Sequence, residues 1–248
     1  MVPIPSRDSK GASSVIQLKN VSLGDTAQWR LRHINLTIKD GEKIGIIGES
    51  GSGKTSLGDL LIGIQRPTEG VIHHDLQIRL PIFQQASLAF NAKRTLGDSL
   101  EETHILAPTR QSSVHERCMH YIQQFGLPSD IVRRYPYEVS GGQLQRLNMI
   151  RTMIVEPDLI VCDEITANVD VLVEQDMIKH LNKYHNDTGK TLVIISHDLA
   201  FLSQCVERFV VLEDGYCVDD FHIDDMFYAS RSMTTKRFIE VYDPPPIK

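Results

Sequence analysis

The sequence predicts an α/β fold with a mostly parallel sheet and a helical segment inserted between its strands. Short apolar runs alternate with helical patterns, and the clearest are residues 44–47, 159–162, 191–195 and 209–212. A glycine-rich loop at 48–55 lies directly between one of these runs and a helical stretch. Strands that alternate with helices are typical of parallel sheets covered by helices.

The N-terminal part supplies short β-like segments. Residues 1–13 are polar and carry prolines and serines, which predicts a loose tail. Val15–Leu18 and Ile34–Ile38 follow as strands, and the second alternates so cleanly that one of its faces should be buried. Asp40-Gly41 predicts a turn before the strand Ile44–Ile47, which leads into the glycine-rich loop.

After the loop, Thr55–Ile62 predicts a helix, and Gly70–Ile72 and Ile78–Phe83 predict further strands. Helical patterns then dominate from Thr95 to Met153, with a break at Gly126-Leu127-Pro128. The β-like runs return only beyond this block, so we interpret the block as an insertion between strands of one sheet.

The chain has 248 residues, enough for one large α/β domain or for a core domain with an inserted subdomain. We expect a single domain over 14–236, with a helical subdomain at about 87–153 and a C-terminal tail at 237–248.

The bulk composition limits the function classes. A formal net charge of -6 argues against a nucleic-acid-binding surface, which needs a basic face. No apolar run approaches the roughly 18–20 residues that span a bilayer, and the first residues lack the apolar core of a signal peptide. The 4 cysteines are scattered without a Cys-x-x-Cys pair, which favours free thiols in a reducing compartment. We therefore expect a cytosolic protein whose membrane role, if any, requires a partner.

The glycine-rich loop fits the pattern G-x-x-x-x-G-K-[ST], and its residues are Gly48, Glu49, Ser50, Gly51, Ser52, Gly53, Lys54 and Thr55, followed by Ser56. A strand, a glycine loop and a helix N-terminus direct several backbone N–H groups and a helix dipole at one point. Lys54 is placed to reach nucleotide phosphates, and the Thr55 hydroxyl to help hold Mg²⁺. The loop therefore predicts a nucleotide-phosphate site.

Two carboxylates end the apolar run Leu159–Cys162, namely Asp163 and Glu164. Ligands gather at the carboxyl ends of parallel strands. Asp163 is placed to bind Mg²⁺, and Glu164 to orient a water for attack on a terminal phosphate. Without the phosphate loop upstream, the pair would be interpreted as a solvated acidic turn.

A second glycine-bearing helix start, Ser140-Gly141-Gly142-Gln143, follows Val139. Its N–H groups and hydroxyl could bind an anion, or Ser140 could act as a plain N-cap. One nucleotide does not need two phosphate-binding turns in one chain.

Val-Ser-Gly-Gly-Gln resembles the Leu-Ser-Gly-Gly-Gln signature of ATP-binding cassette (ABC) ATPases, and the resemblance continues through most of the chain. It implies a P-loop ATPase core with a mostly parallel sheet, an antiparallel β subdomain and an inserted helical subdomain. It also implies ATP and Mg²⁺ as ligands. A P-loop kinase or GTPase would share Lys54 and Asp163 but would leave Ser140–Gln143 without a purpose.

The resemblance assigns further residues. Trp29 lies where the family keeps an aromatic that stacks on adenine, although a buried loop tryptophan is the alternative. Gln84 matches the glutamine that contacts Mg²⁺ or the attacking water, with Gln85 as the competing choice. Asp170 matches the D-loop aspartate, and His197 the histidine that contacts the γ-phosphate. The catalytic set implied is Glu164, His197 and Gln84, and the Mg²⁺ ligands are Thr55, Gln84 and Asp163.

The chain departs from the family at Ile165, where most members have proline. The run from Phe83 to Leu96 resembles the segment of peptide and nickel importers, with Asn91 and Thr95 kept and Ala92 in place of proline. The resemblance favours the nickel or metallophore members over the peptide members.

This resemblance implies partners as well. It predicts transmembrane permease subunits, a second and different ATPase subunit whose ATP would meet Ser140 and Gly142, and indirectly a solute-binding protein. It places the chain at the cytoplasmic face of the cell membrane and predicts no nucleic-acid partner. The alternative is a non-transport ABC ATPase, such as an accessory subunit of a carbon–phosphorus lyase assembly.

Overall fold

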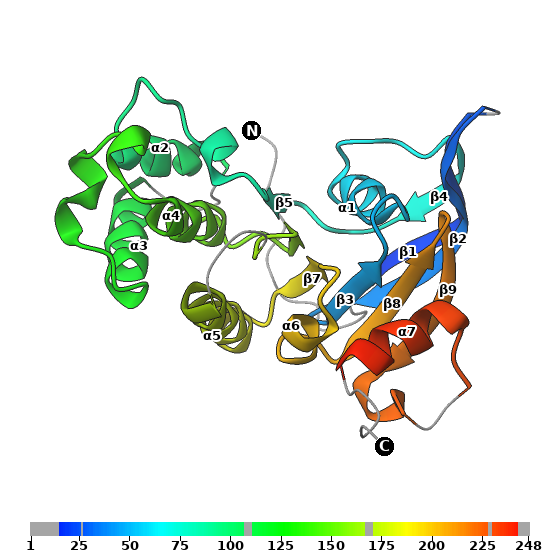
Figure 1. Ribbon diagram of the computed structural model, residues 1–248. Helices are drawn as coiled ribbons and strands as arrows, with labels where there is room; N and C mark the ends of the chain where they lie inside the picture. The colour runs from blue at the N-terminus through cyan, green and yellow to red at the C-terminus, as the bar shows by residue number, and fades with distance from the viewer. Residues whose placement is uncertain (1–14, 26, 107–110, 167–170, 228–229, 243–248) are drawn as a thin grey trace, which may run out of the picture.

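The computed structural model describes residues 15–25, 27–106, 111–166, 171–227 and 230–242. Two sheets and a group of helices make up this part of the chain (Figure 1). The expected tail at 1–13 lies outside the described residues.

The central sheet has 6 strands in the order β5-β6-β7-β3-β8-β9. Its strands are β3 (Lys43–Gly48), β5 (Arg79–Ile82), β6 (Leu159–Asp163), β7 (Thr191–Ile195), β8 (Arg208–Glu213) and β9 (Tyr216–His222). β5, β6, β7, β3 and β8 run parallel, and only β9 pairs antiparallel with β8. Every residue of β7 is buried, as a strand covered on both faces requires.

The smaller sheet is antiparallel, in the order β2-β1-β4. It contains β1 (Val15–Gly24), β2 (Trp29–Lys39) and β4 (Glu69–His73). Buried and exposed side chains alternate along the second half of β2, and the buried ones share a core with α1 (Lys54–Ile62) and the central sheet. The expected fold class, with its antiparallel β part, is confirmed.

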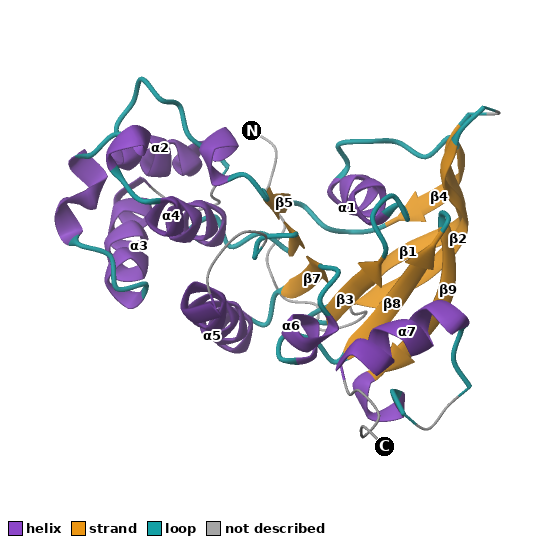
Figure 2. Cartoon of the chain, viewed as in Figure 1, coloured by secondary structure: helices purple, strands orange, loops and turns teal. Residues whose placement is uncertain are grey.

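Helices lie on both sides of the central sheet (Figure 2). α1 packs against β5, β6 and β7, while α5 (Val171–Thr188), α6 (Leu199–Ser203) and α7 (Met233–Tyr242) belong to the second, larger core. The parallel strands are thus enclosed between layers, as the continuous apolar runs predict.

The segment between β5 and β6 is helical. It contains α2 (Leu96–Glu101), α3 (Gln111–Gln124) and α4 (Gly141–Met153), together with the short 3₁₀ turns Ala86–Ala89, Glu102–Ile105, Ser129–Arg133 and Pro136–Glu138. In Figure 1 these helices form a group beside the sheet. Phe125, just after α3, stacks on His180 of α5 with ring centroids 3.6 Å apart, which ties this group to the core.

The C-terminal region differs from the sequence-based expectation. α7 runs across the boundary expected at 236, so part of the predicted 237–248 tail is helical. Thr234 and Thr235 are each 2% exposed, and Phe238 packs against the larger core, because the helix lies against β8 and α6. Within the described ranges, no helix has the length and apolar character needed to cross a membrane.

Candidate functional site

Four neighbouring parallel strands bring the predicted residues together. The phosphate loop follows β3, Gln84 follows β5, Glu164 follows β6 and His197 follows β7. These strands are adjacent in the order β5-β6-β7-β3, so their carboxyl ends lie along one edge of the sheet. The order of the strands, rather than spacing in the sequence, therefore assembles the site.

The phosphate loop is held in a conformation that requires glycine. Gly53, the N-cap of α1, has φ 104°, and a Cβ there would lie 2.5 Å from the Arg30 carbonyl oxygen. Gly51 is also left-handed, with φ 83°, but faces open space. The loop therefore packs closely against β2 on one side and opens on the other.

Lys54 lies inside the loop. Its Nζ donates hydrogen bonds to the carbonyl oxygens of Gly48 at 2.8 Å and Glu49 at 3.0 Å. Burial lowers the pKa of Lys54, and the charges of Glu164 and Asp163 oppose this shift. These two carboxylates thus favour the charged ammonium at the centre of the site.

A cavity of about 400 Å³ opens over the loop, lined by Gln28, Arg30, Ser50, Gly51, Gly53, Lys54, Thr55, Ser56 and Glu164. Most of the predicted loop residues therefore face one space. Gln28 and Arg30 were not predicted from the sequence. Trp29 between them is partly buried and does not line this cavity, because neighbouring strand residues point to opposite sides. The adenine-stacking assignment of Trp29 thus gains no support from this cavity.

Asp163 has the features of a cation ligand. Burial raises the pKa of its carboxyl group, while a hydrogen bond with the Thr55 side chain lowers it. Its Oδ1 is buried and has no hydrogen-bond partner among the described residues. An unpaired buried carboxylate oxygen beside a threonine hydroxyl fits an oxygen-seeking cation such as Mg²⁺.

Glu164 is the point where the predicted catalytic groups meet. Its Oε1 lies 3.9 Å from Lys54 Nζ and 3.7 Å from His197 Nδ1, and its Oε2 accepts a hydrogen bond from Gln84 Nε2 at 3.5 Å. The residue is left-handed, with φ 46°, and its N–H donates to the Ile195 carbonyl oxygen at 3.0 Å. The hydrogen bond to β7 holds this unfavourable backbone conformation and thereby orients the carboxylate.

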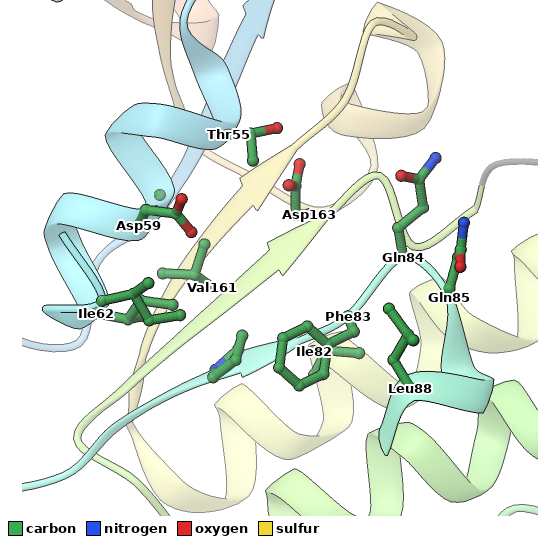
Figure 3. A pocket seen from close by; sticks show the side chains of 13 residues that line it. Thr55, Asp59, Ile62, Ile82, Phe83, Gln84, Gln85, Leu88, Val161 and Asp163 are labelled. Carbon is green, nitrogen blue, oxygen red and sulfur yellow. The ribbon is translucent and has the colours of Figure 1, made fainter. Parts of the chain in front are cut away.

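A second pocket of about 260 Å³ lies beside Asp163 (Figure 3), lined by Thr55, Gly58, Asp59, Ile62, Ile64, Pro81, Ile82, Phe83, Gln84, Gln85, Leu88, Val161 and Asp163. Both glutamines border it, but Gln84 is the one that reaches Glu164. The contact supports Gln84 over Gln85. The apolar residues Ile64 and Leu88 at this pocket are 61% and 72% exposed.

The predicted signature lies elsewhere. Ser140 caps α4 through a capping box, because Gln143 N donates to Ser140 Oγ at 3.3 Å and Ser140 N donates to Gln143 Oε1 at 3.1 Å. Gly141 faces open space, and none of the signature residues lines the described cavity over the phosphate loop. The chain therefore does not bring its two glycine-bearing helix starts together.

Ile165, where the family pattern has proline, is buried and hydrogen-bonded to α4. It is 1% exposed, and its carbonyl oxygen accepts a hydrogen bond from Gln145 Nε2 of α4 at 3.1 Å. The position thus links the segment after β6 to the signature helix. Asp170 lies outside the described residues.

The chain is similar to known proteins over most of its length. The family described as ABC transporter matches residues 31–167. A nickel import system ATP-binding protein, NikE of Staphylococcus aureus (strain USA300), is 38% identical over 231 residues, which are 92% of this chain and 99% of the relative. A dimeric structure of a post-hydrolysis state of the ATP-binding cassette MJ0796, bound to ADP and Pi, matches with a TM-score of 0.73 and 26% identity over 84% of this chain and 98% of that one. The ATP-binding subunit of an ABC transporter, at 20% identity, shares the fold with a TM-score of 0.78 over 91% of this chain and 98% of that one.

Proposed function

The chain belongs to the ATP-hydrolysing subunits of ABC transporters, and from this membership we propose that it powers a nickel importer at the cytoplasmic face of the cell membrane. The 38% identity to a nickel import ATP-binding protein over nearly the whole of both chains supports this cargo. Another metal chelate is the nearest variant of the proposal, and an oligopeptide is the second candidate cargo.

The observation that carries the proposed reaction is the convergence on the Glu164 carboxylate. Lys54 lies 3.9 Å from it, His197 lies 3.7 Å from it and Gln84 donates a hydrogen bond to it. Phosphoryl transfer to water requires a positioned base, a cation at the leaving phosphates and fixed polar groups. Lys54, His197, Gln84 and Glu164 lie at one edge of the sheet, which supports these roles.

Each residue has a specific proposed role. The loop N–H groups and Lys54 bind the phosphates of ATP, and Thr55, Gln84 and Asp163 hold Mg²⁺. Bound Mg²⁺ supplies charge neutralisation at the phosphate oxygens. Glu164 orients the attacking water and accepts its proton, and His197 donates a hydrogen bond to the terminal phosphate.

The site is complete only with a second ATPase subunit. Ser140 and Gly141 are exposed at the start of α4, and neither lines the cavity over the chain's own phosphate loop. They are placed to contact ATP on a partner, while the partner's equivalent residues contact ATP on this chain. Contacts that exist only in the closed pair couple nucleotide binding to closure. A different ATPase chain is the partner we favour.

The pocket beside Gln84 is the proposed contact for a permease. It combines exposed apolar residues, among them Ile64 and Leu88, with Gln84, whose amide reaches Glu164. A helix from the permease that fills this pocket would therefore influence the catalytic carboxylate directly.

Nickel uptake tests the cargo. Cells that lack this gene are complemented with the wild-type chain or with Lys54→Ala, and accumulation of radioactive nickel and of a labelled tripeptide is compared. We expect the wild-type chain to restore nickel uptake and Lys54→Ala not to restore it, since this variant lacks the side chain that is proposed to bind the phosphates of ATP. Restored peptide uptake with unchanged nickel uptake would assign the peptide cargo instead.

The alternative is an accessory ATPase of a soluble assembly, such as a carbon–phosphorus lyase. Purification of the tagged chain from detergent-solubilised membranes separates the two. We expect a multispanning membrane protein and a second ATPase chain to copurify. Soluble enzymes in their place would support the alternative.

A further inference from the structure

The beginning of α7 is fixed to the strands of the central sheet. Thr234 Oγ1 donates a hydrogen bond to Glu213 Oε1, and Thr235 Oγ1 donates to Asp219 Oδ2. Ser232 N donates to the same Asp219 oxygen at 2.8 Å. Both threonines are almost fully buried, so these bonds are shielded from water and hold the helix start in place.

Glu213, which holds Thr234, is also close in the chain to a turn that contacts the phosphate loop. Glu213 ends β8 and is followed by the turn Asp214-Gly215, whose residues have φ 47° and 82°. Gly215 N donates a hydrogen bond to the Ser52 carbonyl oxygen at 3.1 Å, and a Cβ on Gly215 would lie 2.9 Å from the Arg30 carbonyl oxygen. The turn therefore fits tightly between the phosphate loop and β2.

One turn further along α7, Arg237 contacts the phosphate loop itself. Its Nη1 lies 3.9 Å from Glu49 Oε1, and both side chains are largely exposed, at 67% and 71%. The carbonyl oxygen of Glu49 accepts a hydrogen bond from Lys54 Nζ. Glu49 thus connects α7 to the lysine that the proposed mechanism places on the phosphates.

The other end of α7 faces the loop of His197. Phe238, Val241 and Tyr242 border a cavity of about 290 Å³ together with His197, Asp198, Leu199 and Ala200. α7 also packs on α6, which begins two residues after His197, and Figure 1 shows the two helices side by side. A single helix therefore contacts both the phosphate loop and the His197 loop, which follow the adjacent strands β3 and β7.

We propose that α7 is a positioning helix, with Arg237 and Phe238 as positioning residues that hold the phosphate loop and the His197 loop in the relative arrangement that hydrolysis needs. This inference rests on the proposed roles of Lys54, Glu164 and His197. Relative placement of the two loops matters most in the transition state, so its loss lowers the rate of hydrolysis more than the affinity for ATP.

The test uses single-turnover hydrolysis and the dissociation constant for ATP, both measured on the full-length chain in its permease complex. Arg237→Ala is expected to lower the hydrolysis rate roughly two- to fivefold, the range that an exposed ion pair can supply. Phe238→Ala is expected to lower it roughly tenfold, because the His197 loop loses its packing. The dissociation constant for ATP of both variants is expected to stay within about twofold of the wild-type value, because the contacts between the chain and bound ATP are unchanged.

The controls lie on the same helix. Lys236→Ala and Glu240→Ala change exposed residues and should leave the rate unchanged. Arg237→Lys keeps the charge and should restore most of the rate, and Arg237→Ala combined with Glu49→Gln should be no slower than the slower single variant.

The proposal is contradicted if Arg237→Ala and Phe238→Ala hydrolyse ATP at the same rate as the control variants. It is also contradicted if only the affinity for ATP changes, or if the rate falls only as much as the amount of folded protein falls. Hydrolysis by the wild-type chain, and its disappearance in Glu164→Gln, tests the proposed function independently of α7.

Discussion

Glu164 combines catalytic placement with a strained backbone. A left-handed φ of 46° in a non-glycine residue costs about 1–2 kcal/mol, and the N–H bond to Ile195 on β7 compensates for it. This backbone conformation places Glu164 Oε1 3.9 Å from Lys54 Nζ and 3.7 Å from His197 Nδ1. The strain lies at the residue on which the proposed chemistry depends, which is where such strain is commonly found.

Two glycines of the phosphate loop provide a matched pair for mutation. Gly51→Ala adds a methyl group in open space and should cost only the left-handed strain, about 1 kcal/mol of unfolding free energy. Gly53→Ala also drives the methyl group against the Arg30 carbonyl oxygen and Leu31, which should add about 1–3 kcal/mol. Urea denaturation measures both values. Equal costs at the two positions would show that the contact with β2 is unimportant.

At the residue scale, the sequence predicted the polar groups that follow the strands of the central sheet better than those at the start of the smaller sheet's β2. Gln84 and His197 do meet at Glu164, because motif order and parallel strand order agree. Gln28 and Arg30 were missed, since no local pattern shows that β2 passes over the loop. The proposed role of Trp29 stays a prediction, as strand alternation directs it away from the cavity that its neighbours line.

At the element scale, the C-terminal region was the least predictable. The parallel strands follow apolar runs and β2 alternates, whereas β9 (Tyr216–His222) carries Asp219 and Asp220 and has no clear periodicity. The signal that could have found it is Asp214-Gly215, a two-residue hairpin turn with both φ positive. α7 was missed because part of its attachment is polar, through Thr234 and Thr235, and such bonds leave no hydrophobic pattern.

The stack of His180 on Phe125 makes the junction between α5 and the helical segment sensitive to pH. Burial lowers the pKa of His180 below its ordinary value of 6.5, Asp176 raises it, and Arg146 and Lys179 lower it further. The unfolded chain therefore takes up the proton first as the pH falls. Stability from this group is fully present above pH 6.5 and is lost as the pH falls towards the folded pKa.

His180→Phe keeps an aromatic ring on Phe125 and removes the titration. We expect the unfolding free energy of this variant to fall less steeply than that of the wild type as the pH decreases from 6.5. Urea denaturation across this range gives both slopes. An unchanged slope would mean that His180 does not contribute to the acid sensitivity.

At the scale of the whole molecule, the order β5-β6-β7-β3 explains why the residues of the proposed reaction lie along one edge of the sheet. The signature helix α4 lies in the helical segment, and Ser140 at its start does not line the cavity over the phosphate loop. In the proposed function, one chain therefore supplies halves of two different ATP sites. The family and the core could be predicted from motifs, but the identity of the partner that completes each site depends on surfaces of another chain.

The central claim is that Glu164 of this chain hydrolyses the ATP bound at its own phosphate loop. Photoaffinity labelling of the permease complex with azido-ATP, followed by separation of the subunits, reports the nucleotide on this subunit alone. A label on the α-phosphate follows bound nucleotide, and a label on the γ-phosphate is lost on hydrolysis. We predict that Glu164→Gln keeps the α-label at wild-type levels and loses the γ-label about a hundredfold more slowly or slower still. Loss of the γ-label from Glu164→Gln at the wild-type rate would contradict the account.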